Sequence, residues 1–201
     1  MVDGNKLNSV LEFIYFGRTI SSNGCIDDEI QRNVARASAS FGRLRQRLWN
    51  NLHMSMRVKG KIYHAIVLSA LLYGTEAWTV YRQQVKKLYA FMMRHLRSIM
   101  RITGMDKVTN KEILERTELP FMEDLLIRKN FRWTGHLMRM SPDRLPKLIL
   151  YSQQSSSHIK RGLLRLRFKD IIKRNMKLRD ITTDSITSLS QQRDKWRAIV
   201  K

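Results

Sequence analysis

The spacing of apolar residues along the chain changes near residue 25. Before this point, the turn signal Asp3-Gly4 and the aromatic, β-branched run over residues 13–16 are typical of short paired strands. From Ile26 to Leu48, apolar residues instead recur every three or four positions, which is the period of an amphipathic helix. The pattern therefore predicts a small N-terminal β hairpin within residues 1–24, followed by helices.

Residues 25–152 contain several further signals for the ends of helices. Ser55 and Thr109 suit N-cap positions, and Gly74 and Gly104 suit positions just beyond a helix. Pro120 suits a helix start. Together with the apolar spacing, these signals predict helices over residues 26–48, 55–73, 80–100, 109–118 and 120–140. In the helix over 55–73, the spacing places four side chains toward the core: Val58, Ile62, Ile66 and Ser69.

A polar, serine-rich stretch over residues 153–158 predicts a linker. Beyond it, apolar spacing around Ile171 and Trp196 predicts two short helices within a basic tail. The predicted fold class is therefore mainly α, in three parts. These are the β hairpin (1–24), a helical bundle (25–152), and the linker with its basic helical tail (153–201).

The excess of positive charge narrows the choice of partner. The chain has 38 Lys and Arg residues but 17 Asp and Glu residues, which gives a formal net charge of +21. Such a field attracts polyanions, either nucleic acid or an anionic membrane surface. The longest apolar stretch, residues 65–74, is far shorter than the roughly 18 to 20 residues of a membrane span. Charge alone leaves the identity of this partner open. With the rows of basic residues on the predicted helices added, we expect nucleic acid (RNA and RNA:DNA hybrid) as the partner, and neither a membrane nor a small-molecule substrate.

Cysteine usage and the first residues indicate a cellular compartment. The single cysteine, Cys25, cannot form an internal disulfide, which is typical of a reducing environment. Residues 1–6 lack the basic and apolar regions of a secretory signal. We expect an intracellular protein, in the nucleus or in a cytoplasmic ribonucleoprotein, that is not secreted.

Basic residues fall in rows on the predicted helices. At about 100° per residue, these residues cluster opposite the apolar face of three helices. A solvated face also carries charge, but it usually mixes signs, and the first row nearly lacks acidic partners at i+4. We call the candidate nucleic-acid contacts the first row (Arg32, Arg36, Arg43, Arg47), the second row (Lys87, Arg94, Arg97, Arg101), the third row (Arg128, Arg132, Arg139) and the basic tail (Lys160, Arg161, Arg165, Arg167).

Residues that could carry catalysis form no complete set. Asp27 and Asp28 are adjacent carboxylates, a pairing that can hold the two metals of nucleotidyl transfer on a tight hairpin. They stand instead at a predicted helix start, where acidic side chains are favoured by the helix dipole. The five histidines lack metal-ligand spacing, and no phosphate-binding loop or serine elbow is present. We expect no enzymatic activity, cofactor or metal site for this chain alone.

Five aromatic residues have the chemistry to stack on nucleic-acid bases. Their helical or strand spacing favours packing in the core for most of them. They are Tyr15, Phe16, Trp49, Trp78 and Trp133.

Five strings of residues resemble the segment that follows the palm domain in reverse transcriptases of non-LTR, LINE-type retrotransposons. They occur in the family's order within residues 1–151. The first string covers residues 2–24 and includes Tyr15-Phe16-Gly17, where the family usually has Tyr-Leu-Gly. The others are Ala37-Ser38-Ala39-Ser40-Phe41-Gly42-Arg43-Leu44, Leu71-Leu72-Tyr73-Gly74-Thr75-Glu76-Ala77-Trp78-Thr79, Val108-Thr109-Asn110, and Arg132-Trp133-Thr134-Gly135-His136-Leu137-Met138-Arg139-Met140.

The resemblance implies a position within a larger polyprotein. Residues 1–24 would be the end of the palm, with Tyr15-Phe16-Gly17 as a primer-grip-like hairpin near the primer terminus. Residues 25–152 would form the thumb and post-thumb region that clamps the RNA template and DNA primer. The family's catalytic Tyr-x-Asp-Asp hairpin, with its Mg²⁺, lies upstream of the point where this chain starts. The chain would then be a fragment of an RNA-directed DNA polymerase, from a decayed element copy or a fragmentary gene model.

Two interpretations stay open from the sequence. The tail departs from the family, which has Arg-Gly-Arg-Pro where this chain has Arg161-Gly162-Leu163-Leu164-Arg165, so its role does not follow from the resemblance. The leading interpretation is a nucleic-acid-binding fragment that lacks the polymerase site. The second is a helical scaffold protein whose basic faces meet an acidic protein partner, with binding that survives nuclease treatment.

Overall fold

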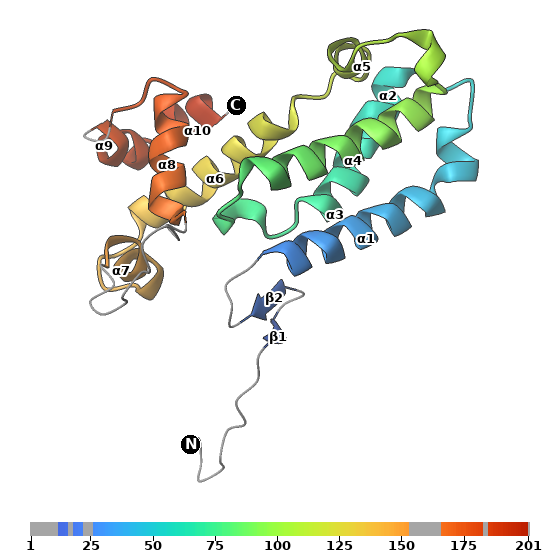
Figure 1. The fold of residues 1–201 in the computed structure, drawn as a ribbon. Coiled ribbons are helices and arrows are strands. Elements are labelled where there is room, and N and C mark those ends of the chain that lie inside the picture. The colour runs from blue at the N-terminus through green and yellow to red at the C-terminus, as the bar shows by residue number, and fades with distance from the viewer. Residues whose placement is uncertain (1–11, 16–17, 22–25, 153–165, 183–184, 201) are drawn as a thin grey trace.

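The computed structural model describes residues 12–15, 18–21, 26–152, 166–182 and 185–200, and its architecture is mainly helical (Figure 1). At the N-terminal end, β1 (Glu12–Tyr15) pairs antiparallel with β2 (Arg18–Ser21), with Phe13 opposite Ile20. The Asp3-Gly4 turn and two residues of the primer-grip-like hairpin, Phe16 and Gly17, lie outside the described residues.

The first core is formed by helices between residues 26 and 126. A long helix over residues 56–71 is α-helical at both ends and π-helical in the middle, and it packs between α1 and α4 through buried residues such as Tyr63, Val67 and Leu71. The elements of this region are α1 (Asp27–Arg43), η1 (Arg45–Trp49), α2 (Met56–Ile62), η2 (Tyr63–Leu68), α3 (Ser69–Leu71), η3 (Thr75–Ala77), α4 (Arg82–Met100), η4 (Gly104–Asp106) and α5 (Asn110–Thr117).

The second core is smaller and is built around the later part of α6 (Met122–Arg139). The side chains of Ile127, Phe131 and Met138 pack there against Ile172 and Trp196. The covering elements are α7 (Leu145–Tyr151), α8 (Phe168–Lys177), α9 (Ser185–Gln191) and α10 (Arg193–Val200). Because Met122, Leu125 and Leu126 belong to the first core, α6 is shared by both.

The expected boundary at residues 152/153 stays a prediction. The second core nevertheless contains side chains from both sides of it, such as Phe131 and Trp196. The long α6 crosses from one group of helices to the other without a break (Figure 1).

Several predicted helix ends are confirmed by their hydrogen bonds. The hydroxyl oxygens of Ser55 and Thr109 accept bonds from the backbone N–H groups of Val58 and Glu112, as N-caps do. Gly74 takes a left-handed conformation with φ 73° beyond the long helix. The prediction of Gly104 as the breaker after α4 is wrong, because Arg101 takes the left-handed position, with φ 57°, three residues earlier.

The predicted inward face of the long helix is confirmed for Ile62, which packs against the first core, and is wrong for its other three residues. Val58 and Ile66 are 42% and 41% exposed, and Ser69 is exposed as well. The buried face is one residue further along and includes Lys59 and Tyr63. The apolar spacing does not reveal this buried face, because a charged lysine occupies one of its positions. The Lys59 ammonium donates to the Trp49 carbonyl at 2.9 Å, so one of its N–H groups has a partner inside the fold.

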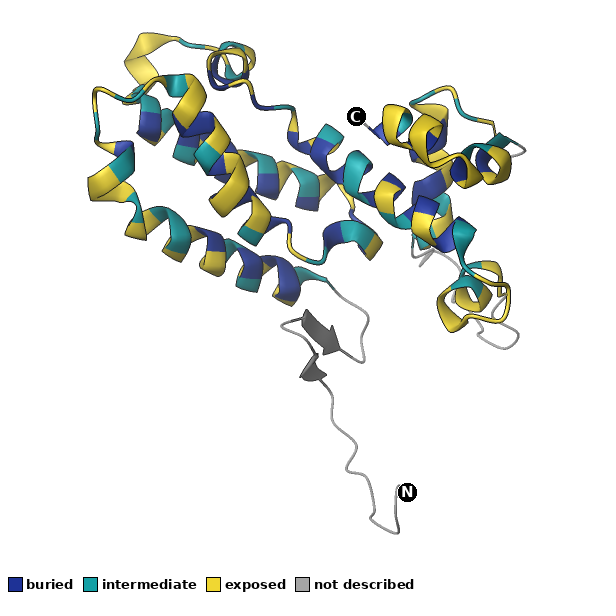
Figure 2. Cartoon of the chain, turned by 180° about the vertical axis from the view of Figure 1, so that it is seen from behind, coloured by how far each residue is buried: buried dark blue, intermediate teal, exposed yellow. Residues whose placement is uncertain are grey.

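Two helices have no counterpart in the sequence prediction. α7 buries none of its side chains and is exposed along most of its length (Figure 2). A helix without a buried face lacks the apolar spacing from which it could be predicted. α9 is a serine- and threonine-rich segment with few apolar residues. Among the described helices, none has both the length and the apolar character needed to cross a membrane.

Candidate nucleic-acid interface

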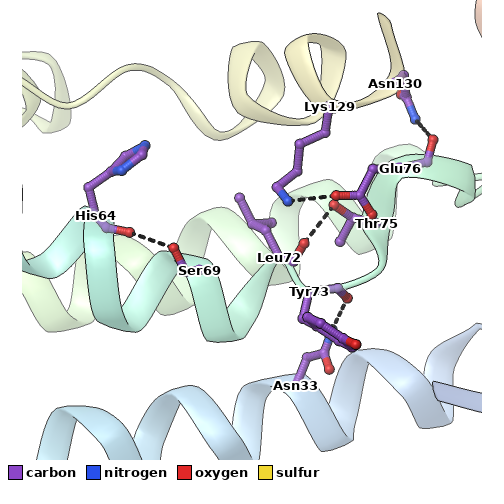
Figure 3. A network of polar contacts seen from close by, with 9 residues as sticks. All are labelled: Asn33, His64, Ser69, Leu72, Tyr73, Thr75, Glu76, Lys129 and Asn130. Atoms are coloured by element: carbon purple, nitrogen blue, oxygen red, sulfur yellow. Dashed lines mark hydrogen bonds and ion pairs between the residues drawn. The ribbon is translucent and has the colours of Figure 1, made fainter. Parts of the chain in front are cut away.

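The string over residues 71–79 forms a junction between helices (Figure 3). At its first half, the Asn33 amide of α1 donates to the Tyr73 carbonyl at 2.9 Å. The Thr75 hydroxyl donates to the Leu72 carbonyl at 3.0 Å, which closes the turn at Gly74. These bonds fix the end of the long helix against α1.

The second half of this string is held by α6 and α1. The Asn130 amide donates to the Glu76 carbonyl at 2.8 Å, and Lys129 forms an ion pair with the Glu76 carboxylate at 2.9 Å. The buried Trp78 indole donates to Glu29 at 3.0 Å. The residues of this string therefore stabilise the fold, because their hydrogen bonds and ion pair connect the end of the long helix and η3 to α1 and α6.

The aromatic side chains of the first core form a stack around His95. Its ring lies 4.0 Å from the Phe41 ring at 5°, and its Nδ1 is 3.3 Å from the Tyr63 hydroxyl. Burial, with a smaller effect of the Arg94 charge, lowers the pKa of His95 to about 4, so the ring is neutral at pH 7. The prediction of core packing is confirmed for Trp49 and Trp78, which are 3% and 1% exposed.

Trp133 is the remaining aromatic candidate whose side chain is described. It is half-buried, and its ring lies 5.4 Å from that of His136 at a tilt of 40°. Of Tyr15 and Phe16, only the backbone of Tyr15 is described, as the last residue of β1.

The first row lies on α1 and its continuation into η1. Arg36, Arg43 and Arg47 are exposed, and Arg32 is half-buried. Neither Arg43 nor Arg47 forms an ion pair with a carboxylate of the described residues, and Arg43 donates only to the Ser40 hydroxyl. The row thus presents positive charge to solvent.

The second row is divided between two roles. Lys87 and Arg94 line a groove between α4 and α1, together with Asp27, Val34 and Phe91. Arg97 instead donates to the Val108 carbonyl and to Asn110, both at 2.9 Å, and so holds the start of α5. Arg97 therefore stabilises the fold, as does Arg101, which ends α4.

The first and second rows are not brought together. On α1, the residues that line the groove with Lys87 and Arg94 include Gln31, Val34 and Ser38. At 3.6 residues per turn, these lie about 150° around the helix from the arginines of the first row. The two rows therefore face different directions.

The third row lies on α6, next to residues that the sequence did not indicate. Arg132 is exposed, Arg128 is half-buried, and Arg139 donates to the Ser190 carbonyl at 2.8 Å. The Nε of Arg128 is buried and has no hydrogen-bond partner among the described residues. The charges of Arg128 and Arg132 act on His64 of η2, and the charges of Arg193 and Arg197 of α10 act on Arg139.

The basic tail is described only at its end. Lys160, Arg161 and Arg165 lie outside the described residues. Arg167 is exposed and pairs with Asp170 at 3.4 Å, in the first turn of α8. This pair stabilises a helix start.

The paired aspartates stand where the helix-start interpretation predicted. Asp27 and Asp28 lie in the first turn of α1, and Asp27 accepts a bond from the Gln84 amide at 3.2 Å. Within the described residues, no group of three His, Cys, Asp or Glu side chains is arranged to hold a metal ion.

Comparison with known proteins gives one informative similarity. The chain is 25% identical over 207 residues to an uncharacterized transposon-derived protein of Caenorhabditis elegans. The alignment covers 98% of this chain and 72% of that protein. No protein-family model and no solved structure matches the chain. The similarity indicates a transposon-related origin.

Proposed function

We propose that this chain binds nucleic acid as the post-palm part of a LINE-type reverse transcriptase, where it grips the RNA template and DNA primer. The similarity to a transposon-derived protein supports the transposable-element origin. The five strings that resemble the family support the more specific assignment to a reverse transcriptase.

One observation carries the proposal of nucleic-acid binding. Five exposed cations, spread over α1, η1, α4 and α6, form no ion pair with any carboxylate of the described residues. Such uncompensated charge favours a polyanionic partner, because each phosphate contact releases condensed counterions. The five are Arg43, Arg47, Lys87, Arg94 and Arg132.

The proposed grip is not a single closed clamp. Because the first and second rows face different directions, one duplex would contact only part of the basic surface. In the parent polyprotein, the palm would supply the polymerase carboxylates and Mg²⁺. This chain would contribute binding and register without catalysing nucleotide addition.

Binding to an RNA:DNA hybrid at 50 and 200 mM salt tests the proposal. With six or more phosphate contacts, the affinity is expected to fall by about a thousandfold or more between these concentrations. An affinity that does not change with salt would contradict phosphate-led binding.

Replacing Arg43 and Arg47 with alanine tests the contribution of the first row. Neither side chain packs in the core, so helicity measured by circular dichroism should stay unchanged while binding weakens. If a partner captured from cells stayed bound after nuclease treatment and the hybrid did not bind, the acidic protein partner would be favoured instead.

A further inference from the structure

The arginines of the third row lie on one side of α6. Arg128, Arg132 and Arg139 lie within about 40° of one another around α6 at 3.6 residues per turn. Eleven residues at 1.5 Å each separate the first from the last by about 16 Å along the axis. The row lies along the second core, because Ile127, Phe131 and Met138 on the same stretch of α6 belong to that core.

Near its N-terminal end, the row is extended by His64. The His64 ring points from η2 toward the side on which α6 lies (Figure 3). Burial and then the charges of Arg132, Arg128 and Lys129 lower the pKa of this imidazole. Lys129 is neutralised by Glu76, whereas Arg128 and Arg132 form no ion pair with a described carboxylate.

At its C-terminal end, the row is extended by α10. The Trp196 indole donates to the Phe131 carbonyl at 3.0 Å and fixes α10 on α6. Arg139 is held by the Ser190 carbonyl, and its pKa is lowered by burial and by the charges of Arg193 and Arg197. Arg197 pairs with Asp194 at 3.2 Å, although both side chains are largely exposed.

Cations gathered in this way repel one another. The charges of Arg193 and Arg197 act on Arg139 from α10, and because Arg197 is paired with Asp194, the repulsion between Arg139 and Arg193 is the one left uncompensated among the described residues. A bound anion would offset this repulsion.

We infer that α6, with His64 on one side and α10 on the other, forms a continuous track that binds the phosphodiester backbone of one nucleic-acid strand. We call it the α6 track: His64, Arg128, Arg132, Arg139, Arg193 and Arg197. This inference rests on the proposed function and gives it a location. A polyanion with closely spaced phosphates can contact both ends of the track at once, because about 16 Å separates Arg128 from Arg139.

The test compares three double variants of the full chain. R132Q/R193Q removes one exposed arginine near each end of the α6 track. K173Q/K177Q removes the same charge from exposed positions on α8, away from its buried face, and is the matched control. R43Q/R47Q removes it from the first row. Probes are a 20-nucleotide RNA and the same RNA annealed to DNA.

The expected result is a selective loss in R132Q/R193Q. For the single strand, the slope of log affinity against log salt should fall by about 1.4, which corresponds to two lost contacts. At 0.15 M salt, the affinity should fall about tenfold, while K173Q/K177Q changes it much less. A larger loss for the annealed probe would indicate that the track holds one strand of a duplex.

Other outcomes separate this inference from the proposed function. If R132Q/R193Q matched its control while R43Q/R47Q lost affinity, the α6 track would be wrong and nucleic-acid binding would stand. If the wild-type chain bound neither probe, both would be wrong. Circular dichroism and thermal unfolding of each variant confirm that a loss of binding is not a loss of fold.

Discussion

The two cores of this protein are held in different ways. The first core has a large set of buried apolar side chains and a neutral histidine stacked between aromatic rings. Within the described part of the chain, the second core has eight buried apolar residues, and one of them, Trp196, donates to a backbone carbonyl of α6. The difference suggests that the second core is more sensitive to the loss of one side chain, and the first more sensitive to acid.

Each core also has one glycine at which two elements touch. A Cβ at Gly60 of α2 would lie 2.2 Å from the Thr117 carbonyl oxygen, and a Cβ at Gly135 of α6 would lie 2.1 Å from the Trp196 Nε1. Both glycines are needed because no side chain fits. One contact is with backbone and the other with a side chain, so the two positions allow a direct comparison.

The largest expected effect is that of Trp196→Ala. Trp196 is 3% exposed, packs edge-on to Phe131 at 5.8 Å and donates to its carbonyl. Truncating a buried tryptophan costs about 3–5 kcal/mol. Amide hydrogen exchange should therefore accelerate in α8 and α10 while α4 stays protected.

Trp196→Phe is the control, because it keeps a buried aromatic ring and loses the indole donor with only part of the ring volume. Its cost should be clearly smaller. Equal acceleration of exchange in both cores would show that they unfold as one unit.

Acid should loosen the first core through His95. Its pKa is about 4 in the folded chain, below the ordinary value of 6.5, so the unfolded chain binds the proton more readily. Stability is therefore full above pH 6.5 and falls as the pH drops toward 4, by up to about 3 kcal/mol. Unfolding by urea at pH 7 and pH 4.5 measures this loss.

His95→Phe keeps a ring beside Phe41 and removes the titration. The variant is expected to lose the Tyr63 hydrogen bond at every pH and to show a weaker pH dependence. A pH dependence equal to that of the wild type would assign the acid sensitivity to other groups.

The two glycines should respond to alanine with smaller losses. Overpacking costs about 1–3 kcal/mol, and Gly60→Ala should be the costlier variant because a backbone carbonyl cannot rotate away. Gly42→Ala is the control, because its Cβ would meet nothing within 4 Å, and it should stabilise α1 by up to about 1 kcal/mol. Thermal unfolding of the three variants gives the order.

The local features of the fold could be predicted from the sequence. Ser55 and Thr109 cap helices through bonds that span three residues, so short strings contain the whole signal. The buried face of the long helix was missed because Lys59 is charged, and its buried partner, the Trp49 carbonyl, is supplied only by the fold.

The candidate site shows the same limit. The third row lies on a single helix, so its spacing is visible in the sequence. Its neighbours His64 and Arg193 come from helices far away in the chain, and no local pattern places them beside α6. Conversely, Arg97 has the spacing of a surface cation but holds the start of α5.

The shared position of α6 has a consequence for synthesis of the chain. The ribosome completes α6 while α8 and α10 have still to be translated, and elongation at roughly 5–20 residues per second makes this delay last on the order of seconds. During that interval Ile127, Phe131 and Met138 have no cover. A nascent chain arrested at this stage would display an apolar stripe, which is a surface that chaperones bind.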